Sequence, residues 1–212
     1  TLLLQHLRPK YIRFAREATP VVTTEDTPFV VGKANVLKLR RESGRMIDAF
    51  EHVLAEQYVS EAEDLTIIAC GPMVPEAMRA AWILKNEFGY DTRVINMHTL
   101  KPLDEAAVVR AARETGIIVT AEEHQIGALA WRVSGVITGS KELYGKPVLT
   151  GAIGVKDRFG DSGAPWELMK EFEVSAEHIA AKARELMMVK HEAILPHGPE
   201  EFALEEALAT SS

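Results

Sequence analysis

Four short apolar runs alternate with segments of helical periodicity, and this alternation constrains the fold more than any other feature of the sequence. The apolar runs cover residues 64–71, 92–100, 116–123 and 147–154. Each of the first three runs is followed by a segment whose apolar residues are three or four positions apart. These segments cover residues 72–88, 102–115 and 127–140. Strands separated by helices of this length form crossovers into a parallel sheet that is covered on both faces. The pattern therefore predicts an α/β domain.

Further elements are predicted on either side of this central region. Residues 32–40 alternate apolar and polar side chains as a strand does, and residues 45–58 have the spacing of an amphipathic helix. Two more helices are expected at 164–172 and 175–191. Near the start of the chain, residues 11–15 form one isolated strand-like run, with no second run before it that could complete a sheet.

Composition and charge exclude several classes of protein. The chain of 212 residues is 47% hydrophobic and 26% charged, as expected for a globular protein with a core of its own. A formal charge of −7 argues against a nucleic-acid partner, because binding to phosphates needs a basic face. No apolar run approaches the length of a membrane span, and the single Cys70 cannot form an internal disulfide. We therefore expect a cytoplasmic protein with neither a membrane nor a nucleic acid as its partner.

The segment FGDSGAP, at 159–165, resembles the nucleophile loop of trypsin-like serine proteases. That chemistry needs His and Asp partners delivered by an all-β scaffold, which an alternating α/β chain does not provide. The better interpretation is a turn, in which Gly160 and Gly163 permit positive φ while Asp161 and Ser162 cap the helix that follows.

Polar residues at the carboxyl ends of the predicted strands are the other candidate site residues, because ligands of open α/β sheets bind there. Glu122, Glu123, His124 and His98 could act together as acid and base groups. The favoured interpretation is that Glu123 and His124 cap the following helix or pair across a subunit interface. The strand-to-helix turn CGPM, at 70–73, could hold an anion on its free N–H groups, with Gly71 and Met73 as weak candidates. The simpler interpretation is a tight turn with Cys70 as a small buried residue.

Several of these segments, taken in order, resemble the C-terminal domain of transketolase. The matching pieces lie between residues 9 and 190, and they read YIRFARE, GKA, LTIIACGPMVPEAMRAA, TRVINMHTLKPLDEAAV, VTAEEHQIGAL and GVKDRFGDSGAPWELMKEFEVSAEHI. Deoxyxylulose-phosphate synthases and the beta subunits of 2-oxoacid dehydrogenases share this domain, but DRFGDSG at 157–163 is most similar to transketolase. The chain departs from the pattern in two places: residues 45–58 are an insertion, and AEEHQIGALAW lacks a second glycine after Gly127.

The resemblance implies an architecture and a division of the chain. The expected fold is α/β, a three-layer α/β/α sandwich with a five-stranded mixed and mostly parallel sheet, in which the strand at 32–40 runs antiparallel to the other four. Residues 1–31 would be the last strand of a preceding pyrimidine-binding domain with its linker. Residues 32–192 would form the C-terminal domain, and residues 193–212 an acidic tail.

The resemblance also implies what the chain does. A complete transketolase, the type of enzyme found in pentose phosphate metabolism, transfers a two-carbon ketol unit from a ketose phosphate to an aldose phosphate. Its other two domains bind thiamine diphosphate and magnesium. The G-D-G…N magnesium motif of those domains is absent here, because the one Gly-Asp pair lies in GDSG. We therefore expect no catalytic, cofactor-binding or metal-binding residues in this chain, no cofactor bound by it alone, and no activity of its own.

The expected role is the assembly of domains or of a dimer. The candidate interface consists of Glu122, Glu123, His124 and Trp131, and the partner would be a second copy, the N-terminal thiamine-diphosphate-binding part, or both. Two alternatives stay open. One is a freestanding regulatory or small-anion-binding module that uses the crevice beside Gly71 and Met73. The other is the C-terminal part of a 2-oxoacid dehydrogenase beta subunit, which DRFGDSG disfavours.

Overall fold

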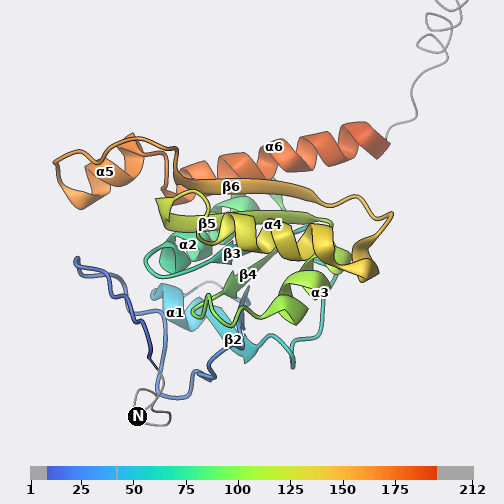
Figure 1. Ribbon diagram of the computed structural model, residues 1–212, viewed down its shortest axis with the longest axis horizontal. Helices are drawn as coiled ribbons and strands as arrows, with labels where there is room; N and C mark the ends of the chain where they lie inside the picture. The colour runs from blue at the N-terminus through green and yellow to red at the C-terminus, as the bar shows by residue number, and fades with distance from the viewer. Residues whose placement is uncertain (1–8, 42, 195–212) are drawn as a thin grey trace, which may run out of the picture.

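The apolar runs form the centre of a six-stranded sheet with the strand order β2-β1-β4-β3-β5-β6 (Figure 1). A computed structural model describes residues 9–41 and 43–194 of the chain. The strands are β1 (Asn35–Leu39), β2 (Phe50–Leu54), β3 (Leu65–Ala69), β4 (Thr92–Asn96), β5 (Ile117–Gln125) and β6 (Leu149–Val155). The strands β4, β3, β5 and β6 pair in parallel, while β1 pairs antiparallel with both β4 and β2. The mixed, mostly parallel sheet predicted from the sequence is confirmed, including the reversed direction of β1.

Helices cover both faces of this sheet and complete the three predicted layers. On one face lie α2 (Met73–Phe88), α5 (Pro165–Glu171) and α6 (Ala176–Ile194), and on the other α3 (Glu105–Thr115) and α4 (Ala130–Gly139). Alternate residues of one strand serve the two faces: Ile67 belongs to the core under α2 and α6, and Ile68 to the core under α3 and α4. Two separate hydrophobic cores therefore hold the layers together.

A buried carboxylate, Asp104, sets the start of α3 and anchors the start of β1. Its Oδ1 accepts a hydrogen bond from the backbone N–H of Ala107 at 3.1 Å, which caps the helix, and its Oδ2 accepts one from Ala34 at 2.8 Å. The helix consequently begins at Glu105, three residues later than the sequence pattern predicted. At the other end of α3, Gly116 adopts a φ of 69° and ends the helix in the left-handed conformation that glycine permits.

The predicted helix at 45–58 is wrong. Only α1 (Met46–Ala49) is helical, and the chain then continues directly into β2. The apolar residues that suggested a helical face also suit a half-buried strand, and Phe50 is buried in the core below α2. Pairing with β2 satisfies backbone groups of β1 that would otherwise lie at the sheet edge, so the sheet has six strands rather than five.

The strand predicted at residues 11–15 does not form in this chain. The segment has no regular secondary structure, and its Tyr11 and Phe14 side chains are 88% and 84% exposed. A strand needs a neighbour for its backbone hydrogen bonds, and no strand of the described sheet pairs with this segment. The assignment of residues 1–31 to a preceding domain remains a prediction. Of the predicted acidic tail, residues 193–194 belong to α6, and the rest lies outside the described residues.

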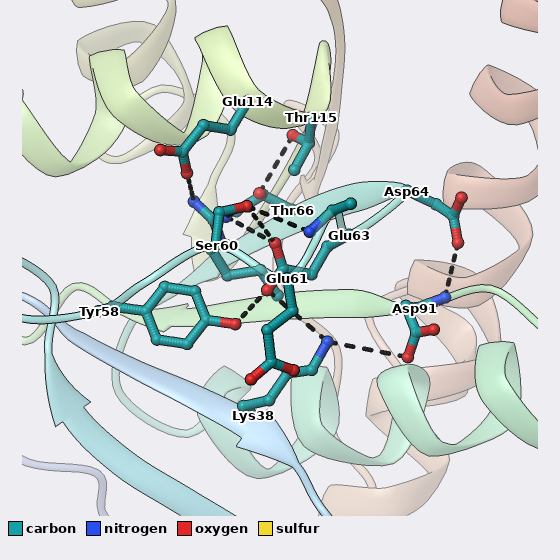
Figure 2. A network of polar contacts seen from close by, with 12 residues as sticks. Lys38, Tyr58, Ser60, Glu61, Glu63, Asp64, Thr66, Asp91, Glu114 and Thr115 are labelled. Carbon is teal, nitrogen blue, oxygen red and sulfur yellow. Dashed lines mark hydrogen bonds and ion pairs between the residues drawn. The ribbon is translucent and has the colours of Figure 1, made fainter.

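A network of buried ions joins β4, the end of α3 and the segment that follows β2 (Figure 2). The side chains of Arg93 and Glu63 are 2% and 0% exposed, and one guanidinium nitrogen of Arg93 donates to Glu63 at 2.6 Å. A second nitrogen donates to Glu114 at 2.6 Å, and the Tyr58 hydroxyl donates to Glu63. Burial alone would raise the pKa of Glu63, but the hydrogen bonds from Tyr58 and Arg93 outweigh burial and lower it to about 2. Glu63 is therefore charged and fully paired.

We expect Arg93→Met to lower the free energy of unfolding by about 3–5 kcal/mol, because it removes the hydrogen-bonded cation of the buried Glu63 carboxylate and leaves only the longer contact with Lys38 at 3.6 Å. The control is Arg113→Met, which removes an exposed ion pair with Glu142 at 3.3 Å and should cost less than about 1 kcal/mol. Urea denaturation of both variants at neutral pH measures the difference. Because the folded pKa of Glu63 is lowered, its contribution should be present at neutral pH and be lost as the pH falls toward about 2. Equal, small losses in the two variants would contradict this account of the network.

Candidate functional site

The carboxyl ends of β3, β4, β5 and β6 bring the candidate residues to one edge of the sheet, which we call the carboxyl edge. Gly71 follows β3, His98 follows β4, Glu122 to His124 lie in the last part of β5, and the GDSG segment follows β6. Parallel strands place these segments at the same end of the molecule, where α4 also begins and α5 lies (Figure 1).

Glu122 is a buried internal cap. It is 1% exposed, and its carboxylate accepts three backbone hydrogen bonds from the turn between β5 and α4. Oε1 accepts from Gly127 and Ala130 at 3.1 Å each, and Oε2 accepts from Leu129 at 2.8 Å. The carboxylate supplies the acceptors that the first turn of α4 lacks. The sequence suggested Glu123 and His124 as caps of this helix, but Glu122 performs the capping.

Glu123 and His124 lie on the surface beside this cap. Both residues are exposed, and His124 Nδ1 lies 3.1 Å from the backbone carbonyl of Gln125. Partial burial raises the pKa of Glu123, and the nearby positive charge of Arg13 opposes that shift. Arg13 belongs to the irregular N-terminal segment, so this segment reaches the carboxyl edge.

Trp131 presents a large exposed surface at the start of α4. Its side chain is 71% exposed, whereas Leu129 two residues earlier is fully buried. One face of the indole lies against Gly127, where an added Cβ would come within 2.8 Å of a ring atom. Gly127 has a φ of 136°, which glycine adopts without strain. Glycine at this position therefore lets the indole rest on the backbone while most of the side chain stays exposed.

Two of the N–H groups that an anion would need are used within the turn after β3. The backbone N–H of Met73 donates to the carbonyl of Cys70 at 3.3 Å, and that of Val74 donates to Gly71 at 3.1 Å. The Met73 side chain is buried in the core. Burial and the negative charge of Glu122 raise the pKa of the Cys70 thiol to about 11, so the thiol is protonated and is a poor nucleophile. The structure favours the interpretation of this segment as a tight turn.

His98 does not join His124 in an acid–base pair. Its ring stacks on Phe29 with 4.3 Å between the ring centroids, and its Nδ1 shares a 2.9 Å hydrogen bond with the Thr99 hydroxyl. Burial lowers the pKa of His98, with the charge of Asp104 opposing the shift. The imidazole therefore holds the segment that precedes β1 against the loop that follows β4.

The predicted turn at GDSG is wrong: the segment is irregular with a bend at Gly163, neither Gly160 nor Gly163 has a positive φ, and Ser162 does not cap the next helix. Ala164 occupies the N-cap position of α5 in an extended conformation, and no side chain caps the helix there. Asp161 instead lies 3.8 Å from Arg158, in a weak exposed ion pair. The α/β scaffold around this segment is also unlike the all-β scaffold of the proteases, so the motif has no role as a nucleophile loop.

Exposed aromatic residues at the carboxyl edge were not among the predicted site residues. Together with Trp131 we call them the edge aromatics. Each lies either in a segment that follows a strand end or in the N-terminal segment that carries Arg13. Their exposed fractions are 88% for Tyr11, 84% for Phe14, 97% for Phe159, 71% for Trp131 and 66% for Trp166. Exposed large apolar side chains are a common feature of protein-binding surfaces. Only Phe159 lies in a predicted turn, whereas Tyr11 and Phe14 lie in the predicted strand and Trp131 and Trp166 lie in predicted helices, so the sequence pattern did not mark this set.

Two other kinds of site are not found in the described structure. Within residues 9–41 and 43–194, no group of three His, Cys, Asp or Glu side chains is arranged to hold a metal ion. Over the same residues, none of the helices combines the length and the apolar character that crossing a bilayer requires.

Comparison with known proteins gives consistent matches. A family profile described as "Transketolase, C-terminal domain" matches residues 55–179. The 6-deoxy-6-sulfo-D-fructose transketolase subunit SqwH of Clostridium sp. (strain MSTE9) is 34% identical over 186 residues, which cover 87% of this chain and 49% of that protein. A putative transketolase C-terminal section of Methanocaldococcus jannaschii is 33% identical over 188 residues, covering 87% of this chain and 50% of that protein.

A solved structure is also similar. It is the structure of a split-gene transketolase, described as an inactive beta4 tetramer, and it superposes with a TM-score of 0.64 at 32% identity. The superposition covers 82% of this chain and 48% of that one. The chain therefore spans about half the length of the relatives that it matches.

We expect Glu122→Gln to lower the free energy of unfolding by about 1–3 kcal/mol, because an amide nitrogen would replace one of the two oxygens that accept backbone N–H groups. Glu123→Gln is the matched control, since it makes the same chemical change one residue away at an exposed position, and it should change stability by less than about 0.5 kcal/mol. Thermal and urea unfolding of the two variants test the difference. If both substitutions have the same effect, the capping role of Glu122 is wrong.

Proposed function

Because the chain belongs to the transketolase family through its C-terminal domain, we propose that it is the C-terminal part of a transketolase and acts only together with an N-terminal part. The assembled enzyme transfers a two-carbon ketol unit from a ketose phosphate to an aldose phosphate in the cytoplasm. The N-terminal part supplies the thiamine diphosphate and magnesium site, and this chain supplies a surface for assembly.

Names of the relatives support a two-part enzyme. The chain covers about half of each relative, and those proteins are described as a transketolase subunit and as a C-terminal section. One of the subunits of an apulose-4-phosphate transketolase from Phocaeicola vulgatus is a further relative, 34% identical over 188 residues. The similar solved structure comes from a split gene and is an inactive beta4 tetramer. By analogy, we propose that this chain self-associates when its N-terminal partner is absent and is then inactive.

Two segments at the carboxyl edge, the turn after β3 and the one capped by Glu122, do not fit a thiamine diphosphate–magnesium site. At the carboxyl edge, the N–H groups of Met73 and Val74 are used within the turn. The Glu122 carboxylate is occupied by three backbone donors. In these two segments, neither a free nest of N–H groups nor a free buried carboxylate is therefore available to a diphosphate or its metal ion.

The edge aromatics are the single observation that carries the assembly role. Trp131 projects from the start of α4 with Glu123 and His124 beside it, so an aromatic anchor has polar neighbours that can form a rim. Tyr11 and Phe14 extend the same surface from the segment that precedes the domain. Glu122 supports this surface from below by fixing the turn that carries Trp131. We assign the surface to the N-terminal part of the enzyme.

The first test is complementation. We expect the isolated chain to show no ketol transfer and no binding of thiamine diphosphate, and activity to appear when the purified N-terminal part is added. Isothermal titration calorimetry with thiamine diphosphate and magnesium measures cofactor binding, and a coupled sugar-phosphate assay measures transfer. Tight, magnesium-dependent binding of the cofactor to the isolated chain would overturn the proposed division of labour.

The second test addresses the surface. We expect the double substitution Glu123→Ala with Trp131→Ala to weaken association with the N-terminal part by roughly tenfold or more, as loss of an interface anchor does. Tyr144→Ala is the control, because Tyr144 is 65% exposed but follows α4 at the opposite edge of the sheet. Analytical ultracentrifugation measures association, and circular dichroism confirms that both variants are folded. Unchanged association of a folded double variant would remove the interface from this surface.

A further inference from the structure

A cavity of about 170 Å³ lies at the starting edge of the sheet, where β4 begins and β1 ends. The end of β1 and the residues after it form one wall, the last turns of α2 form the second, and Asp91 and Thr92 close the third side. Its volume is more than ten times the roughly 10–15 Å³ that one water molecule requires. The cavity therefore has room for a small ligand, and it is separate from the carboxyl edge and from the edge aromatics.

The lining of the cavity is basic in a protein of net charge −7. Lys38, Arg40, Arg41 and Lys85 line it, and Asp91 is the single carboxylate among its lining residues in the described structure. Asp91 accepts a hydrogen bond from Lys85 at 2.9 Å, so those two charges compensate each other. The nitrogens of Arg40 are engaged by two exposed carboxylates, Glu51 and Glu61. Of the four cations, Lys38 and Arg41 are the two that keep side-chain N–H donors without an acceptor among the described residues.

Lys38 carries a nearly buried ammonium group that makes only long ion contacts. Its side chain is 7% exposed, and its Nζ lies 3.6 Å from Glu63 and 3.7 Å from Asp91, too far for hydrogen bonds to either. An ammonium has three donors, and burial makes unused donors costly. An acceptor within the cavity would relieve this cost.

Arg41 offers a planar guanidinium at the mouth of the same cavity. Its one hydrogen bond in the described structure is a long one, from Nε to the backbone carbonyl of Asp48 at 3.3 Å. Its two terminal nitrogens are consequently available for the bidentate contact that guanidinium makes with oxyanions. Trp82, which is 48% exposed on α2, provides a rigid wall beside it.

We propose that this cavity binds a small oxyanion of the phosphate class, held by the Lys38 ammonium and the Arg41 guanidinium. Both groups line one cavity, and neither donates a short hydrogen bond to a carboxylate among the described residues, since Lys38 makes only the two long ion contacts to Glu63 and Asp91. The ligand is either free phosphate or the phosphoryl group of a sugar monophosphate. This site is independent of the proposed assembly role, because no residue is shared between the cavity and the interface.

Calorimetric titration of the full chain with sodium phosphate, at an ionic strength held constant with sodium chloride, tests the proposal. We expect saturable binding to wild type and an approximately tenfold larger Kd for Arg41→Ala, which removes one charge-assisted contact. Arg132→Ala, an exposed arginine of α4 on the other face of the sheet, is the matched control and should leave the Kd unchanged. A parallel titration with a sugar monophosphate identifies the source: tighter binding than phosphate assigns a phosphorylated metabolite, and equal binding assigns the free anion.

Hydrogen exchange measured by mass spectrometry locates the site in the same samples. Phosphate should protect peptides that contain residues 38–41 and 82–92 and leave those that contain residues 70–74 unchanged. Lys38→Met should abolish this protection, and if that variant does not fold, the exposed Arg41→Ala decides the question by itself. An absence of saturable binding in wild type, equal affinities of wild type and Arg41→Ala, or protection confined to residues 70–74 would overturn the proposal.

Discussion

Burial of the central strands on both faces is the constraint on which the rest of the structure depends. All five residues of β3 are buried, and its adjacent residues Ile67 and Ile68 serve different cores. A strand of this kind is stable only between two layers of helices, so polar groups collect at the two ends of the strands. At the carboxyl edge, the Glu122 carboxylate fixes a turn, and several aromatic side chains stay exposed. At the starting edge, Arg93 and Glu63 neutralise each other, and Lys38 faces a cavity.

Those parts of the fold that follow from apolar periodicity could be predicted from the sequence. The strands β3 to β6 and the long helix α2 have patterns that suit one structure only, and each forms close to its expected position. The segment that becomes α1 and β2 could not be predicted, because Phe50, Val53 and Leu54 fit a helical face and a half-buried strand equally well. The segment forms a strand because it pairs with β1. Such pairing depends on the three-dimensional arrangement of the strands and is not visible in the local sequence. The start of α3 was set similarly, by the capping contact of Asp104 rather than by the pattern around it.

Candidate site residues were located by the sequence, but their roles were not. Glu122 and Glu123 are adjacent and chemically identical, so the pattern could not tell which carboxylate points inward to the N–H groups of α4. Trp131 could have packed on its own sheet, and its exposure follows from Gly127 allowing the indole to rest on the backbone. The cavity beside Lys38 joins residues of β1, α2 and β4 that are distant in sequence, so no local motif marks it.

The contacts that anchor the segment before β1 also limit where its aromatic side chains can lie. Phe29 is held on His98, Ala34 is held by Asp104, and Val22 packs against the core under α2 and α6, so the segment is anchored at several points before the sheet begins. These anchors confine Tyr11 and Phe14, and Arg13 between them lies near Glu123, so the two aromatic residues have a high effective concentration at the carboxyl edge. If a partner binds Trp131, as proposed, it also meets Tyr11 and Phe14 on the same chain. Such bivalent contact would lengthen the residence time of the partner, although no strand joins the two regions.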